Sequence, residues 1–90
     1  MNRNLMYNIL KEKGLYPIIR HHRDRRTYHT EFVVQNHQDC SLILDWGYIR
    51  HIKRISLCSS EIVVEGEYTD MMVNINYKDL ENVEVRIIEE

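Results

Sequence analysis

The sequence predicts a mainly β, α+β domain in which one N-terminal helix precedes a small antiparallel barrel of the SH3-like or Sm-like kind, or an open sheet. Two observations lead to this fold class. Apolar residues recur with helical spacing before Gly14 and with a period of two from Thr27 onward. Composition agrees, because 43% hydrophobic residues, three Gly and one Pro are typical of a folded globular chain. We expect a single domain over residues 1–90, with five or six short strands between residues 27 and 88.

A helix is predicted over about residues 3–13. The apolar residues that share one stripe at 3.6 residues per turn are Leu5, Met6, Ile9 and Leu10. The side chain of Asn2 or Asn4 can cap the first turn, and Gly14 suits the left-handed backbone conformation that often follows a helix. Pro17 prevents the helix from continuing.

Alternation of apolar and polar residues predicts strands over most of the remaining chain. The residues expected to face one common interior are Tyr28, Thr30, Phe32 and Val34, then Leu42, Leu44 and Trp46, then Ile62, Val64 and Tyr68, then Val73, Ile75 and Tyr77, and finally Val83, Val85 and Ile87. Turns are expected where polar or flexible residues gather, at residues 36–39, 59–60 and 66–70.

Residues 48–57 allow two interpretations. Apolar residues recur there with helical spacing, at Tyr48, Ile49, Ile52 and Ile55, yet β-branched residues dominate the segment. We favour a long bent strand with a bulge near Ile52, and a helix is the alternative.

Several features indicate a soluble, cytoplasmic protein. No run approaches the roughly 20 apolar residues that span a bilayer, and the N-terminal segment is too polar for a signal peptide. Two cysteines, Cys40 and Cys58, are too few for a disulfide framework, so we expect free thiols in a reducing compartment.

Charge is distributed unevenly along the chain. Residues 1–54 carry ten Lys/Arg against five Asp/Glu, whereas residues 55–90 carry two against nine. The candidate site for an anionic partner consists of two basic clusters: Arg20, Arg23, Arg25 and Arg26 in the first, and Arg50, Lys53 and Arg54 in the second. Guanidinium groups suit phosphates and carboxylates, and strands could bring the two clusters together. The alternative is a solvated loop over residues 20–26 whose charge is offset by nearby acidic residues.

No metal site, cofactor or catalytic residue is predicted. Zinc needs four well-placed ligands, and the sequence offers one closely spaced pair, His37-x-x-Cys40. The other side chains on which a zinc site could draw are His21, His22, His51 and Cys58. The sequence has no Gly-rich phosphate loop, nucleophile elbow or metalloprotease motif, so the chain is not expected to be an enzyme.

The C-terminal half has a recognisable order of elements. A strand with Ile52 and Ile55, a polar turn, and a second strand with Ile62 and Val64 precede the terminal stretch INYKDLENV, residues 75–83. This order is similar to that of the YolD-like family of small bacterial and phage-borne proteins, over somewhat under half the chain. The resemblance implies an accessory role beside DNA-damage or mobile-element functions, acting by protein contacts and without catalysis.

These observations predict a non-enzymatic accessory or regulatory protein of bacterial or phage origin that binds another macromolecule, foremost another protein. Self-association is also expected, because a short sheet leaves edges that a second copy can cover. The alternative is a nucleic-acid-binding small barrel that uses the basic clusters of residues 20–26 and 50–54. Replacing Arg23, Arg25 and Arg26 by Glu distinguishes the two: lost nucleic-acid binding with unchanged oligomer size supports the alternative.

Overall fold

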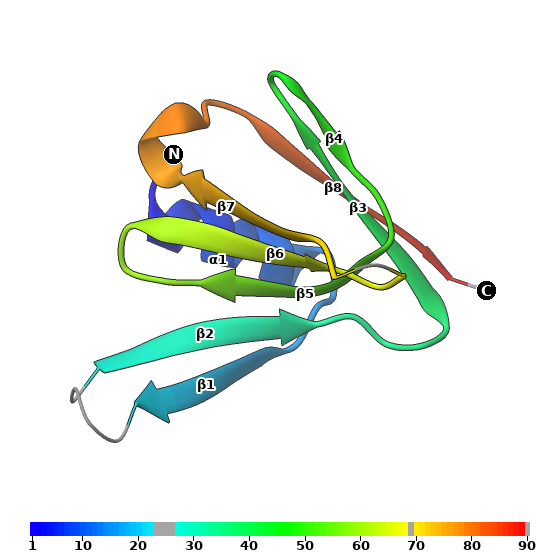
Figure 1. Cartoon of the computed structure of the whole chain (residues 1–90), viewed down its shortest axis with the longest axis horizontal. Helices are drawn as coiled ribbons and strands as arrows, with labels where there is room; N and C mark the ends of the chain where they lie inside the picture. Colours follow the sequence, from blue (N-terminus) through cyan, green and yellow to red (C-terminus); the bar gives the residue numbers. More distant parts are fainter. Residues whose placement is uncertain (23–26, 69, 90) are drawn as a thin grey trace.

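One helix and eight strands build the part of the chain that the computed structural model describes, residues 1–22, 27–68 and 70–89. The strands form two antiparallel sheets, which confirms the predicted mainly β fold with an N-terminal helix (Figure 1). Eight strands in this part of the chain exceed the five or six expected. The additional ones come from a strand before residue 27 and from the division of residues 48–57 between the two sheets.

The two sheets differ in size and are joined by short connections. The larger sheet has the order β1-β2-β5-β6-β7, with β1 at Pro17–His22, β2 at Thr27–Val33, β5 at Ile52–Leu57, β6 at Glu61–Gly66 and β7 at Met72–Asn76. The smaller sheet has the order β4-β3-β8, with β3 at Gln38–Leu44, β4 at Gly47–Ile49 and β8 at Val83–Glu89. A short 3-10 helix, η1 at Tyr77–Asp79, connects β7 to β8.

The helix α1 spans Arg3–Glu12 and has the ends that the sequence predicts. The side chain of Asn2, and not that of Asn4, accepts a hydrogen bond from the backbone N–H of Leu5 at 2.8 Å. Gly14 follows the helix with φ +92°, in the left-handed region that glycine adopts freely. No helix in the described residues is long and apolar enough to cross a membrane.

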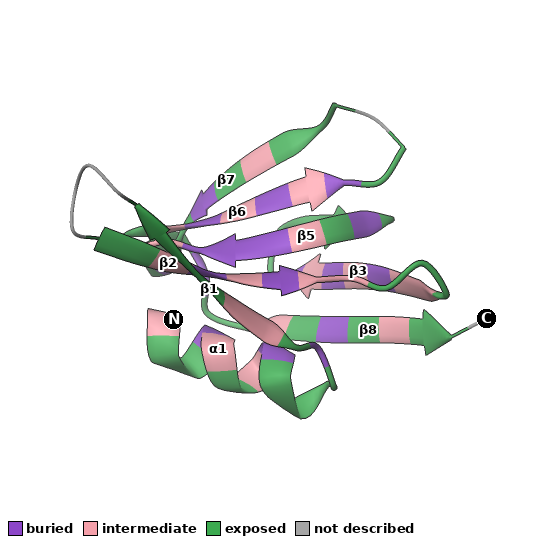
Figure 2. Cartoon of the chain, turned by 90° about the horizontal axis from the view of Figure 1, so that it is seen from below, coloured by how far each residue is buried: buried purple, intermediate pink, exposed green. Residues whose placement is uncertain are grey.

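One hydrophobic core unites α1 with both sheets. In Figure 2, α1 and β8 lie below β5, β6 and β7, and the buried positions of β6 alternate with positions of intermediate burial. The side chains that are less than 2% exposed include Met6 and Leu10 from the helix, Phe32, Ile55 and Ile62 from the larger sheet, and Leu42 and Val85 from the smaller one. Each sheet therefore has an inner face against this core and an outer face toward solvent.

Three aromatic residues that were predicted to face the interior lie at the surface instead. Tyr28, Trp46 and Tyr68 are 57%, 60% and 75% exposed, respectively. Tyr28 is the second residue of β2 and precedes the first buried position of that strand. Trp46 lies in the turn between β3 and β4, and Tyr68 follows the end of β6. Period-two alternation could not show that β3 ends at Leu44 and β6 at Gly66, nor that the start of β2 is not covered by the core.

The strand β1 was not predicted, because the expected strands begin only at residue 27. Residues 17–22 instead pair with β2 at the edge of the larger sheet. Pro17 occupies the first strand position, where its missing N–H is tolerated. The last four residues of β1 are all exposed, so the strand has no alternating burial that a sequence pattern could reveal.

The ambiguous segment 48–57 is extended, and the helical alternative is wrong. A register shift between Ile52 and Arg54 confirms the bulge predicted near Ile52. The segment is nevertheless not one bent strand, since β4 and β5 belong to different sheets. His51 makes the crossing with φ +52°, a left-handed conformation that few non-glycine residues adopt.

Candidate functional site

The structure describes four of the seven predicted basic residues and places them in different surroundings. Arg23, Arg25 and Arg26 lie outside the described residues. Arg20 and Arg54 share the outer face of the larger sheet, where both approach Glu31. The two clusters thus meet in part, through one arginine from each.

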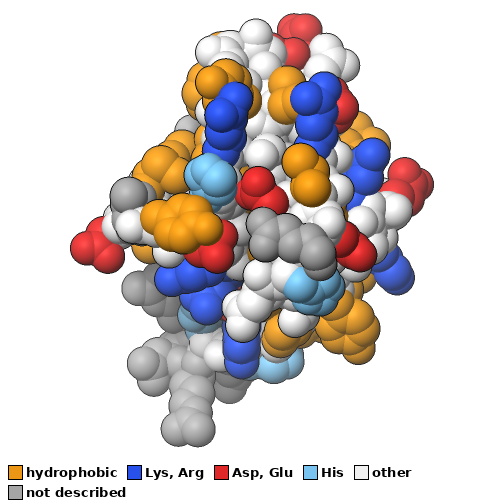
Figure 3. All heavy atoms as spheres, turned by 90° about the vertical axis from the view of Figure 1, so that its right-hand side faces the viewer, with side chains coloured by type: hydrophobic (Ala, Val, Ile, Leu, Met, Phe, Trp, Pro, Cys, Tyr) orange, Lys and Arg blue, Asp and Glu red, His pale blue; other side chains and the backbone are white. Residues whose placement is uncertain are grey.

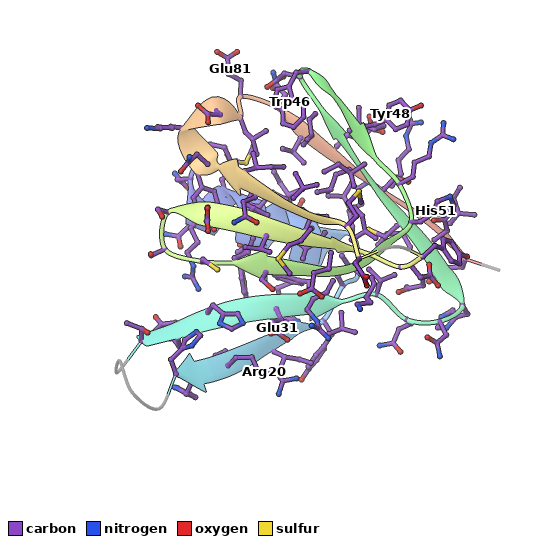
Figure 4. The ribbon with its side chains drawn as sticks, in the orientation of Figure 1. Arg20, Glu31, Trp46, Tyr48, His51 and Glu81 are labelled. Carbon is purple, nitrogen blue, oxygen red and sulfur yellow. The ribbon has the colours of Figure 1, made fainter. Side chains whose placement is uncertain are left out.

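An alternating row of charges crosses the outer face of the larger sheet. Arg20 Nε donates to Glu31 Oε2 at 3.2 Å, and Arg54 Nε lies 3.8 Å from the same oxygen. Arg54 Nη1 donates to Glu65 Oε2 at 3.1 Å. Figure 4 shows Arg20 and Glu31 on the neighbouring strands β1 and β2. Both arginines are therefore neutralised within the sheet.

Glu31 is the centre of this row and is held as a carboxylate. Partial burial by itself raises the pKa of Glu31, but hydrogen bonds from His29 and Arg20 and the charge of Arg54 outweigh it, so the net pKa lies below its ordinary value. His29 Nε2 lies 2.9 Å from Glu31 Oε1, and His29 Nδ1 lies 2.7 Å from His22 Nε2. The row consequently extends from Glu65 to His22 along one face.

A hollow on the outer face of the smaller sheet has a different character. We call it the outer groove. It has a volume of about 480 Å³ and is lined by Asp39, Ser41, Ile43, Tyr48, Arg50, His51, Arg86 and Ile88. Tyr48 and Ile88 are 61% and 64% exposed, so this hollow presents two large apolar side chains to solvent. Figure 3 shows exposed hydrophobic side chains between basic, acidic and histidine side chains on this side of the molecule.

The charges beside the outer groove are partly paired. Arg86 Nε donates to Glu84 Oε1 at 3.1 Å, and His51 Nδ1 lies 3.3 Å from Asp39 Oδ1. The guanidinium of Arg50 lies over the ring of Tyr48, with its Cζ atom 4.7 Å from the ring centroid. Among the described residues, no carboxylate forms an ion pair with Arg50.

Lys53 belongs to neither surface. Its side chain is exposed on β5, where it lines a hollow of about 80 Å³ together with Val34 and Glu67. This hollow is too small for more than a few water molecules. The structure therefore separates Lys53 from Arg50 and Arg54, although the three are close in sequence.

The sequence interpretation missed part of the outer groove, although signals for it were present. Ile87 and Ile88 are adjacent in a strand, so one of the two must face solvent. Trp46 lies at the tip of the hairpin that β3 and β4 form. Its neighbours are Asp45 and Gly47, residue types that are typical of a turn. Neither signal shows that a groove lies between β4 and β8, because that depends on the pairing of both strands with β3.

The ligand pairs considered for zinc do not assemble. Cys40 is fully buried, and desolvation together with the charge of Asp39 raises the pKa of its thiol to about 12, which opposes formation of a thiolate. His21 and His22 are consecutive in β1 and so point to opposite faces. In residues 1–22, 27–68 and 70–89, no three or more His, Cys, Asp or Glu side chains are grouped to hold a metal ion.

Comparisons with known proteins add no relative. No family model, no curated protein and no solved structure matches the chain. The functional argument therefore rests on the geometry of the two outer faces.

Proposed function

We propose that this protein is a non-catalytic binding module that engages another protein through the outer groove. The observation that carries the proposal is the exposure of Tyr48 and Ile88 on opposite strands of one hollow. Large apolar side chains at the rim of a concave surface are typical of interaction sites. Burial of Tyr48 and Ile88 against a partner would remove their apolar surface from water, which favours the complex over the free protein.

The side chains of the groove are of the types that dominate binding free energy in protein interfaces. Tyr, Trp and Arg are enriched among such residues, and the groove and its hairpin present Tyr48, Trp46 and Arg50. The stacking of Arg50 on Tyr48 orders the guanidinium before binding, which lowers the entropy lost on association.

The charges indicate the chemistry of the partner. Arg86 and His51 already have acidic neighbours, so the groove as a whole has little net field to attract a polyanion. Arg50 has no such neighbour among the described residues and remains open to a carboxylate. We therefore expect a protein partner that presents an apolar side chain next to an Asp or Glu.

The test compares affinity capture from the native host by the unaltered protein, by Tyr48→Ala and by Tyr16→Ala. Tyr16 is 75% exposed, lies between α1 and β1 and does not line the groove, so it is a matched control. A partner that binds the groove should be captured by the unaltered protein and by Tyr16→Ala, and lost with Tyr48→Ala. With the purified partner, Tyr48→Ala should weaken binding by about 30-fold, the loss typical of an interface residue worth about 2 kcal/mol.

Equal capture by all three proteins would contradict the proposal.

A second copy of the chain could also occupy the groove, and the mass of the protein in solution tests this. The strands β1, β7, β4 and β8 stand at sheet edges, so self-association remains a prediction of the fold. A dimer that Tyr48→Ala dissociates would identify the groove as a self-association surface.

A nucleic acid is the second candidate partner. The observation in its favour is that Arg20 and Arg54, from the two basic clusters, lie on one outer face. Their pairing with Glu31 and Glu65 weakens the case, since a phosphate would have to compete with both carboxylates. If about five phosphates are neutralised, the log–log slope of affinity against salt should be near −4 to −5.

The accessory role implied by the resemblance to the YolD-like family stays a prediction. The residues that carry the resemblance are largely buried, among them Ile52, Ile55, Ile62, Val64 and Ile75. Buried residues report on how a chain packs and not on what it binds. The outer groove and the charged face are therefore the places where a shared partner would have to be sought.

A further inference from the structure

His22 and His29 lie side by side on the outer face of the larger sheet. In the pairing of β1 with β2, Arg20 is opposite His29 and His22 is opposite Thr27, so the two histidines are diagonal neighbours on one face. Their ring centroids are 4.8 Å apart. His22 is exposed whereas the side chain of His29 is 18% exposed, so solvent reaches the pair mainly from the His22 side.

Two ring nitrogens of these histidines face each other. His22 Nε2 and His29 Nδ1 are separated by 2.7 Å, so a single hydrogen lies between them and one nitrogen offers a lone pair. The contact of His29 with Glu31 determines which of the two nitrogens offers the lone pair. Glu31 Oε1 lies 2.9 Å from His29 Nε2, and Arg20 Nε donates to the other oxygen of the same side chain, so His29 Nε2 donates to Glu31 and Nδ1 is left as the acceptor toward His22.

We propose that His22 and His29 form a two-imidazole site for a divalent transition-metal ion of the Cu²⁺, Ni²⁺ and Zn²⁺ group. A carboxylate that orients a ligating imidazole through its other nitrogen is the usual support of a histidine ligand. Glu31 stands in that position and is itself held by Arg20. Neutral imidazole is a preferred ligand of these ions and a poor one for Mg²⁺ or Ca²⁺.

The pair must open slightly and its rings must turn to bind an ion. With metal–nitrogen bonds of about 2.0–2.1 Å, two imidazole ligands have nitrogens roughly 3 Å apart. The ion would replace the hydrogen between His22 Nε2 and His29 Nδ1, which are 2.7 Å apart, and His22 would carry its proton on Nδ1. Because the two nitrogens now point toward each other, the rings must also turn so that both lone pairs meet at one ion, and the exposure of His22 leaves room for its ring to turn.

The chain supplies two ligands, so the remaining positions are open. A pocket of about 690 Å³ borders both histidines and leaves space for water molecules or for a ligand from a bound molecule. Such a site exchanges its ion readily and differs from the closed four-ligand sites that hold structural zinc. It also lies on the larger sheet, whereas the outer groove lies on the smaller one, so it stands independently of the proposed function.

Titration of the tag-free protein with Cu²⁺, Ni²⁺ and Zn²⁺ tests the site by calorimetry, with Mg²⁺ as the negative control. We expect saturable binding of one ion, with Cu²⁺ the tightest. The spin resonance of bound Cu²⁺ should show two nitrogen ligands. His22→Ala and His29→Ala should abolish this binding, while Glu31→Gln should weaken it by about 10–100-fold.

The matched control is His21→Ala, which removes a histidine from the same strand but from the opposite face. It should bind Cu²⁺ as the unaltered protein does, and circular dichroism should show that every variant keeps its strands. His22 is exposed, so His22→Ala tests the site even if His29→Ala fails to fold. Absence of saturable binding, or an equal affinity in His22→Ala and the unaltered protein, would show that the two rings form a hydrogen-bonded pair only.

Discussion

At the scale of single residues, Glu31 organises the outer face of the larger sheet. Its side chain is 13% exposed and contacts His29, Arg20 and Arg54, which come from three different strands. A carboxylate that is mostly buried loses hydrogen bonds to water. The hydrogen-bond donors and positive charges around Glu31 take the place of those water molecules. One acidic residue thereby determines how two cations and a histidine are oriented.

Replacing Glu31 by Gln tests this role through the pH dependence of stability. Because the pKa of Glu31 is lowered in the folded protein, its contribution to stability is complete above the ordinary value of 4.5 and is lost as the pH falls through the lowered pKa. At pH 7, Glu31→Gln should reduce the free energy of unfolding by about 1–2 kcal/mol. Urea unfolding at pH 3 should show a smaller difference between the variant and the unaltered protein.

Glu84→Gln is the control for Glu31→Gln. Glu84 also accepts a hydrogen bond from an arginine, Arg86, but both side chains are more than half exposed. Exposed ion pairs contribute little, so Glu84→Gln should change stability by less than about 0.5 kcal/mol at either pH. If Glu84→Gln reduced the free energy of unfolding as much as Glu31→Gln does, the burial and the three partners of Glu31 would add nothing to its contribution to stability.

At the scale of elements, α1 shows how local chemistry sets both ends of a helix. The N–H of Leu15 donates to the carbonyl of Leu10 at 3.3 Å, and the N–H of Gly14 donates to that of Lys11 at 3.0 Å. These two bonds, with the left-handed Gly14, form a Schellman motif. Leu10 and Leu15 are both buried, so the motif also turns the chain toward β1 over an apolar contact.

The backbone conformation of Gly14 leads to the second prediction. Gly14→Ala should destabilise the protein by about 1 kcal/mol, because a left-handed conformation is costly for a residue with a Cβ atom. Gly47→Ala is the matched control, since a Cβ atom added to either glycine would have no neighbour within 4 Å and only Gly14 has a positive φ. Thermal unfolding followed by circular dichroism should show the difference, and equal effects would contradict the strain argument.

At the scale of the whole molecule, one core makes the helix and both sheets a single unit. The strand order places β3 and β4 in one sheet and β5 in the other, so the chain leaves the smaller sheet at Ile49 and enters the larger one at Ile52. The left-handed conformation of His51 makes this change of sheet possible within two residues. Side chains from both sheets then meet those of α1 in one cluster.

This shared core predicts cooperative unfolding. Leu10 is fully buried in the cluster, so Leu10→Ala should reduce the free energy of unfolding by about 2–5 kcal/mol. Leu5→Ala, on the same helix but 48% exposed, should cost less than about 1 kcal/mol. The fluorescence of Trp46 reports on the smaller sheet and circular dichroism on the whole chain. Their urea transitions should coincide in Leu10→Ala, whereas separate midpoints would show two independent units.

The candidate sites could be predicted from the sequence only in part. Arg20 and Arg54 were recognised as basic residues, yet nothing near them in sequence indicated Glu31 and Glu65 as their partners. Tyr48 was recognised as an aromatic, but its position in the same groove as Ile88 depends on the pairing of both β4 and β8 with β3. A charge or an aromatic ring is visible in the sequence, whereas its neighbour across a sheet is not.

By itself the sequence determined the features that arise from interactions within a few residues: the helix with its Asn2 cap and its Gly14 end, and the alternation that predicts strands between residues 27 and 88. Only the tertiary structure decided which strands pair and where the chain passes from β4 in one sheet to β5 in the other. It also decided that Tyr28 and Trp46 are exposed and do not pack in the core. The physical reason is that backbone preference and side-chain period are local, whereas burial depends on which distant segment covers a face.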